Sequence, residues 1–146
     1  MNHKNMEDFL IKIKGVQIVQ GDSDVVEVLT KGSFCRTKDA YLISYDESAA
    51  TGFDGAHTTL RFDLADNRVT MSRTGSLNTQ LIIEEGQRHQ CTYDTGYGQM
   101  TIGVLGNRIQ HNLSEEGGDI SFGYSLDVDT ALASENKVYI SVAKPQ

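Results

Sequence analysis

Apolar and polar side chains alternate with a period of two along most of the chain, which is the pattern of β-strands that bury one face and expose the other. The centre of the chain shows this pattern most plainly, because short alternating runs are separated there by residues at which the backbone can reverse. These runs cover residues 69–75, 79–84, 88–93 and 99–103. Short strands joined by tight turns indicate an antiparallel meander.

The flanking segments extend the same pattern in both directions. Alternating runs cover residues 9–18, 25–36, 40–47 and 56–64 before the centre, and 108–113, 119–128 and 137–143 after it. Two irregularities are predicted: a β-bulge at Gly15, where the apolar parity changes, and a chain reversal at Gly106-Asn107. No segment keeps the spacing of an amphipathic helix for long, and residues 129–133 could form one helical turn at most.

About ten successive strands without crossover helices predict an all-β fold, a single antiparallel up-and-down β-barrel. The barrel is expected to be one domain over residues 1–146, with residues 1–8 disordered. Closing the sheet into a barrel also removes the exposed edges that would promote aggregation. A Greek-key sandwich is the alternative, because the pattern alone does not determine the order of strands in the sheet.

The composition bears on the expected partners. The 146 residues contain 13 Lys and Arg against 20 Asp and Glu, a formal net charge of −7. This charge repels nucleic-acid backbones and anionic membrane surfaces, so neither is an expected partner, whereas the oligomeric state stays open. The first residues lack the apolar segment of an export signal, and no apolar run approaches the roughly 20 residues of a membrane-spanning helix. We therefore expect a cytoplasmic protein in which Cys35 and Cys91 are reduced.

Several segments, in their order and spacing, resemble those of a known family. They are Tyr45-Asp-Glu-Ser48 followed by Thr51-Gly52, Arg73-Thr-Gly75, Tyr93-Asp-Thr-Gly-Tyr-Gly98, and Leu113-Ser-Glu-Glu-Gly-Gly118 running into Tyr124. Together they are similar to the YwiB-like family of bacterial proteins of unknown function, over most of the chain. One departure is Gly96, where the family motif often has proline. The resemblance implies a lipocalin-like (calycin) β-barrel with a small cavity, and it implies no reaction or ligand.

Charged residues on faces that otherwise look buried are the main candidates for a site. Glu47 and Arg73 each continue a row of alternating apolar residues, so both are predicted to face the barrel interior near a strand end. A charge in that position is costly unless it is paired and hydrogen-bonded. Arg73 could bind an anionic group of a ligand at the barrel mouth, with Glu47 orienting it. Alternatively, the two form a structural ion pair, or the strand ends reach water.

Aromatic and histidine side chains supply further candidates. Tyr93, Tyr97 and Tyr124 could line a pocket with their rings and hydroxyl groups, or could belong to an ordinary core. His89 and Cys91 share one strand face, but positions two apart on a strand are about 7 Å apart, too far for direct proton transfer. The four histidines and two cysteines show no metal-ligand spacing, so no metal and no other cofactor is expected.

The sequence therefore predicts noncovalent binding of a small molecule or a peptide in the barrel or at its mouth. The predicted binding residues are Glu47, Arg73, Tyr93, Tyr97 and Tyr124. One alternative is an enzyme, such as a hydrolase, that uses Glu47, Arg73 or His89, and another is a protein-interaction scaffold with a solid core. A cavity open to solvent would favour binding, a perturbed acid beside a base would favour catalysis, and a packed interior with an exposed apolar patch would favour the scaffold.

Overall fold

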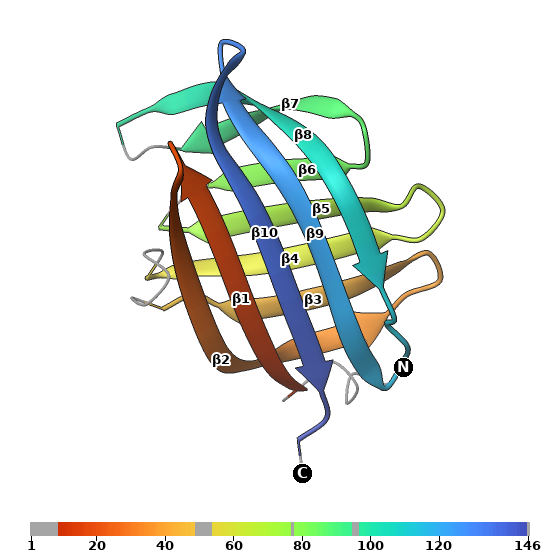
Figure 1. Ribbon diagram of the computed structural model, residues 1–146. Coiled ribbons are helices and arrows are strands. Elements are labelled where there is room, and N and C mark those ends of the chain that lie inside the picture. The colour runs from red at the N-terminus through yellow and green to blue at the C-terminus, as the bar shows by residue number, and fades with distance from the viewer. Residues whose placement is uncertain (1–8, 49–53, 77, 95–96, 146) are drawn as a thin grey trace.

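The computed structural model describes residues 9–48, 54–76, 78–94 and 97–145, whose regular structure is entirely β-strand (Figure 1). Residues 1–8, which were expected to be disordered, lie outside these ranges. Within the described ranges no helix is long and apolar enough to cross a membrane. The strands are β1 (Phe9–Val19), β2 (Asp22–Arg36), β3 (Ala40–Asp46), β4 (Ala56–Asp63), β5 (Arg68–Gly75), β6 (Thr79–Glu84), β7 (Arg88–Asp94), β8 (Gln99–His111), β9 (Gly117–Val128) and β10 (Ala131–Ala143).

The strands form one antiparallel sheet that curls until its two ends almost meet. Their order is β6-β5-β4-β3-β2-β1-β10-β9-β8-β7, so in the described residues every strand pairs with its neighbours in the sequence except β6 with β7, and β1 also pairs with β10. In Figure 1 the steep strands β1, β10, β9 and β8 cross in front of the transverse strands β3 to β6. The predicted up-and-down barrel is therefore confirmed, and the Greek-key alternative is wrong.

A close backbone approach joins the two ends of the sheet. Although β6 and β7 form no continuous ladder in the described residues, the turn between them docks on β8. The N–H of Gly86 donates to the carbonyl of Gly106 at 3.0 Å, and the N–H of Gly106 donates to the carbonyl of Gln87 at 3.1 Å. A Cβ on Gly106 would lie 2.2 Å from the carbonyl oxygen of Glu84, so the approach requires glycine.

The chain reversal predicted at Gly106-Asn107 is consequently wrong. Strand β8 continues through these residues, and its register with β9 shifts between Gly106 and Ile109. The N–H of Ile109 at this irregularity donates to Glu85 Oε2 at 2.7 Å. Glycine serves here for close approach and not for a turn.

The bulge predicted at Gly15 is also wrong. Strand β1 keeps an unbroken register with both β2 and β10, so its inward row continues from Ile13 through Gly15 to Gln17. The apolar residues that suggested a change of parity lie on the other face, where Val16 is opposite Val25. As a result, the inward row of β1 carries no apolar side chain at positions 15 and 17.

The two ends of the barrel are filled differently. At one end the rings of Phe34 and Tyr41 stack with centroids 5.9 Å apart, and the Tyr41 hydroxyl donates to the Leu113 carbonyl at 3.1 Å. Burial of each large apolar side chain in this solid core stabilises the fold by roughly 1.5–3 kcal/mol. Its least exposed members include Ile11, Phe34, Ile43, Phe62, Val69, Ile83, Val104 and Ile120. We call the opposite end, where Glu47, Arg73 and Tyr124 lie, the open end.

Candidate functional site

A cavity of about 190 Å³ occupies the open end of the barrel. A Cβ built on Gly15 would meet no atom within 4 Å, so the missing side chain at this position leaves part of that space. The exposed residues Gln17 and Asp24 also line the cavity, which therefore opens to solvent. The apolar part of its wall includes Ile13, Val26, Val28, Leu60, Met71, Val138 and Ile140.

The cavity lies where β2 separates from β3. Strand β2 pairs with β3 only from Gly32 to Arg36. Residues 22–31 of β2 pair with β1 and with no other described strand. Gly32 stands at the point of separation, where a Cβ would lie 2.3 Å from the Ser44 carbonyl oxygen. Figure 1 shows β2 curving away from β3 along the margin of the sheet. The inward side chains of β2 thus face β3, β4 and β5 across the cavity.

A polar cluster occupies the wall formed by β3, β4 and β5. Glu47 Oε2 accepts hydrogen bonds from Thr58 Oγ1 and, at 3.3 Å, from Arg73 Nε. The register brings these groups together, because Thr58 lies directly opposite Tyr45 on one side and Arg73 on the other. The Glu47 side chain is 1% exposed and that of Arg73 is 18% exposed. The buried carboxylate is therefore compensated by two donors, one of which carries a positive charge.

Two buried tyrosines, Tyr45 beside this cluster and Tyr124 on β9, also line the cavity. Burial, followed by the negative charge of Glu47, raises the pKa of Tyr45. Burial raises the pKa of Tyr124 to about 12, although the positive charge of Arg73 opposes this shift. Both hydroxyls are therefore neutral at physiological pH. A ligand that contacts Tyr45, Tyr124 and the polar cluster would meet neutral hydroxyl groups and an ion pair without net charge.

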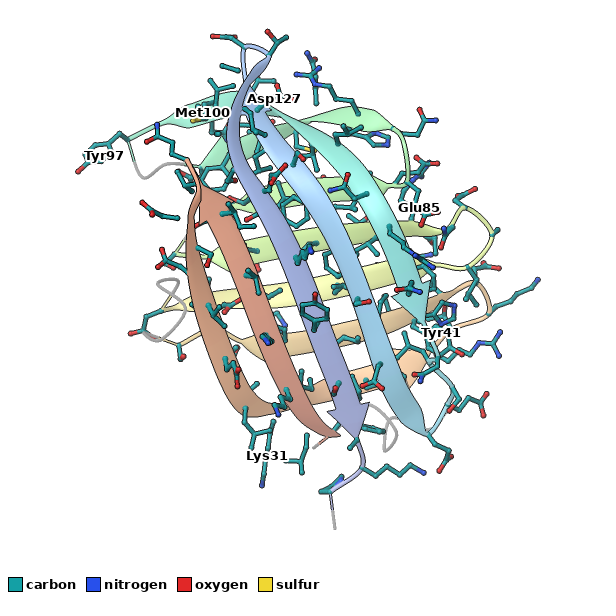
Figure 2. All side chains as sticks on the ribbon, viewed as in Figure 1. Lys31, Tyr41, Glu85, Tyr97, Met100 and Asp127 are labelled. Carbon is teal, nitrogen blue, oxygen red and sulfur yellow. The ribbon has the colours of Figure 1, made fainter. Side chains whose placement is uncertain are left out.

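The structure brings three of the five predicted binding residues together. Glu47, Arg73 and Tyr124 line the cavity. Tyr93 lies on β7 at the same end, partly buried and packed against the core, but it is not among the lining residues. Tyr97 has a fully exposed side chain that points away from the barrel in Figure 2. Thr95 and Gly96, which precede Tyr97 in the predicted reversal, lie outside the described residues.

Sequence reasoning missed three contributors to this site. Tyr45 precedes Glu47 by two positions, so the alternation that placed Glu47 inward also placed Tyr45 beside it. Thr58 carries no comparable signal, because a threonine within an alternating run is ordinary. Gly15 was interpreted as a bulge, since a sequence does not show what stands opposite an absent side chain.

His89 lies apart from the cavity. Its Nε2 is 3.0 Å from Glu84 Oε1, to which Arg68 Nε also donates at 3.4 Å. The hydrogen bond from His89 lowers the pKa of Glu84. Because His89 is not among the residues that line the cavity, it does not form one site with Glu47 and Arg73.

The described residues also offer little for metal or thiol chemistry. Within them, no group of three or more His, Cys, Asp or Glu is placed to hold a metal ion. Cys35 on β2 and Cys91 on β7 are free thiols, and burial raises the pKa of both. A raised pKa lowers the thiolate fraction at neutral pH, so neither thiol is an activated nucleophile.

Comparison with known proteins agrees with this architecture. Residues 11–140 match the family model described as a domain of unknown function, DUF1934. The structure is similar to the crystal structure of the YwiB protein from Bacillus subtilis, with a TM-score of 0.82 and 21% sequence identity over 98% of this chain and 95% of that chain. The predicted resemblance to YwiB-like proteins is confirmed, and at this identity the likeness establishes the fold alone. No curated protein matches the chain.

Proposed function

We propose that this chain, which belongs to the DUF1934 family of domains of unknown function, binds a small apolar group noncovalently in the cavity at its open end. The group is either a free small molecule or a side chain of a peptide. The observation that carries the proposal is a solvent-accessible cavity of about 190 Å³ with a largely apolar wall. An engineered apolar cavity of about 150 Å³ holds benzene, so this cavity has room for a group of at least that size.

The polar cluster restricts the chemistry of the ligand. The charge of Arg73 is balanced by Glu47, which favours the structural role for this ion pair over direct binding of an anion. Tyr45 and Tyr124 line the same cavity, and a tyrosine hydroxyl can donate or accept a hydrogen bond. We therefore favour a ligand with an apolar body and one neutral hydrogen-bonding group. The cavity also favours binding over the scaffold alternative, which requires a solid core.

The test of the proposal uses Gly15, because a Cβ there would meet no atom within 4 Å and Gly15 lines the cavity, so a larger side chain would take up part of its space. Toluene, benzyl alcohol and benzoate are titrated calorimetrically into the wild type, Gly15→Val and Gly15→Leu. We expect benzyl alcohol to bind the wild type best, and its affinity to fall as the side chain at position 15 grows.

Ser121→Leu is the matched control, since it adds the same side chain between the inward residues Ile120 and Phe122, on the outer face of β9. This variant should bind benzyl alcohol like the wild type. The proposal is overturned if the wild type binds none of the three probes, or if Gly15→Leu binds them equally well.

A further inference from the structure

We infer that the free edge of β2, residues 22–31, binds an extended polypeptide segment as an added β-strand and that an apolar side chain of this segment enters the cavity. The inference rests on the proposed function, because it names the ligand class for the same cavity. It follows from the backbone edge, from the side chains beside it and from their charge.

The backbone of this segment presents an unpaired edge in the described structure. Residues 22–31 pair with β1 on one side, and the ladder with β3 begins only at Gly32, opposite Tyr45. In an antiparallel pair every second residue directs its N–H and C=O away from its partner. The edge therefore offers a row of backbone donors and acceptors, which is what recognition by strand addition requires.

Apolar side chains lie beside this edge on both faces of the strand, and most of them are exposed. On the outer face Val25 and Leu29 are 54% and 69% exposed. On the inner face Val26 is 39% exposed and, together with Val28, lines the cavity. A strand added about 4.8 Å from β2 would cover Val25 and Leu29 with its outer side chains. Its inner side chains would lie beside Val26 and Val28, at the entrance of the cavity.

The charge of the segment selects a basic partner over a second copy of the chain. Residues 22–31 contain Asp22, Asp24 and Glu27 against Lys31, three negative charges against one positive, and the whole chain carries −7. A second copy along the same edge would bring together two segments that each carry a net charge of −2, three negative charges against one positive, which is unfavourable. A partner segment in which apolar residues alternate with Lys or Arg would place its cations beside Glu27 and its apolar side chains over the cavity.

The probe is a set of capped peptides of sequence Thr-Val-Lys-Xaa-Lys-Val-Thr, in which Xaa is Ala, Val, Leu or Phe. Binding is measured by fluorescence anisotropy, and amide hydrogen exchange is followed over residues 22–31. We expect affinity to depend on the size of Xaa, and exchange of alternate amides in residues 22–31 to slow when peptide is bound. The best peptide is then N-methylated along one edge or the other. Blocking the edge that pairs with β2 should weaken binding about tenfold or more, and blocking the other edge should not.

Two protein variants separate this inference from the proposed function. Val25→Lys combined with Leu29→Lys changes the edge without touching a residue that lines the cavity. It should weaken peptide binding about tenfold or more and leave benzyl alcohol binding unchanged. Gly15→Leu should weaken both.

Several results would overturn the inference. Peptide binding that survives both N-methylated forms, or that survives the double lysine variant, shows that no strand is added to β2. A wild type that binds benzyl alcohol but no peptide of the set refutes strand addition and leaves the proposed function standing. Protection of residues 22–31 that rises with the concentration of the protein alone identifies a second copy as the occupant.

Discussion

Replacing Arg73 by Met should remove a large part of the stability of the barrel, because it leaves the Glu47 carboxylate buried without its cation. Removing one partner of a buried ion pair costs roughly 3–5 kcal/mol, whereas an exposed pair is worth roughly 0–1 kcal/mol. The Glu47 side chain is 1% exposed, but Arg73 is 18% exposed and Thr58 still donates to the carboxylate. We therefore expect a loss near the lower limit, about 3 kcal/mol. In a domain of this size that corresponds to a fall in melting temperature of about 6–12 °C.

Urea unfolding of the wild type, both single variants and the double variant measures this coupling. Glu47→Gln combined with Arg73→Met should recover most of the loss, because the neutral amide can still accept the hydrogen bond from Thr58. Arg61→Met is the matched control, since Arg61 donates to a carboxylate at 2.9 Å but its side chain is 45% exposed. A loss below about 0.5 kcal/mol in Arg73→Met, or a double variant no more stable than this single one, would refute the reasoning.

Three other predictions concern the backbone contact and two groups of ionisable side chains. Gly106→Ala should lower the free energy of unfolding by about 3 kcal/mol or more, because the new Cβ would lie 2.2 Å from the Glu84 carbonyl oxygen; a near-neutral change in urea unfolding would contradict the close approach. Tyr45 and Tyr124 should stay protonated as the pH passes their ordinary pKa of 10.0, so at least these two of the six tyrosines should be missing from the ultraviolet titration of the folded protein. The stability that their neutral forms contribute is fully present below pH 10.0 and is lost as the pH rises through the raised folded values, and ionisation of all six together would contradict their burial. The lowered pKa of Glu84 contributes stability that is present above its ordinary pKa of 4.5 and is lost as the pH falls below it, so Glu84→Gln should flatten the acid side of the melting-temperature profile, and an unchanged profile would rule out the contribution.

The alternation of side chains predicted most of the fold, but it predicted neither the regular pairing at Gly15 nor the close backbone contact at Gly106. Alternation reports which face of a strand is buried, and it placed Glu47 and Arg73 correctly towards the interior. It does not report how closely two backbones approach. Gly106 was interpreted as a reversal because glycine serves both turns and close contacts, and the contact with Glu84 depends on a strand distant in the sequence. The distance between two such backbones is determined only when the sheet is assembled.

The candidate site likewise depends partly on the pattern within each segment and partly on how the strands pair. That Glu47 meets Arg73 depends on the registers of β3, β4 and β5, which place Thr58 opposite Arg73. These registers are set by turns and neighbouring strands, and not by the pattern of any one segment. Tyr97 was predicted as a binding residue because its ring and hydroxyl group could line a pocket, but it lies in a predicted reversal of the chain, and alternation gives no facing direction there. Its exposed position therefore could not be derived from the pattern.

The pairing of β1 with β10 also determines when the barrel can form during folding. Every other ladder joins strands that follow each other in the chain, but this one places Leu10 opposite Ala143 and closes a loop over nearly the whole domain. Loop closure over that distance costs more entropy than any hairpin, and pairings of high sequence separation form slowly. On a ribosome the earlier hairpins can form as they emerge, whereas β1 gains its second neighbour only after β10 has been synthesised. We infer that this closure limits the folding rate, in which case Ile140→Val should slow refolding in stopped-flow experiments, and an effect confined to the unfolding rate would count against it.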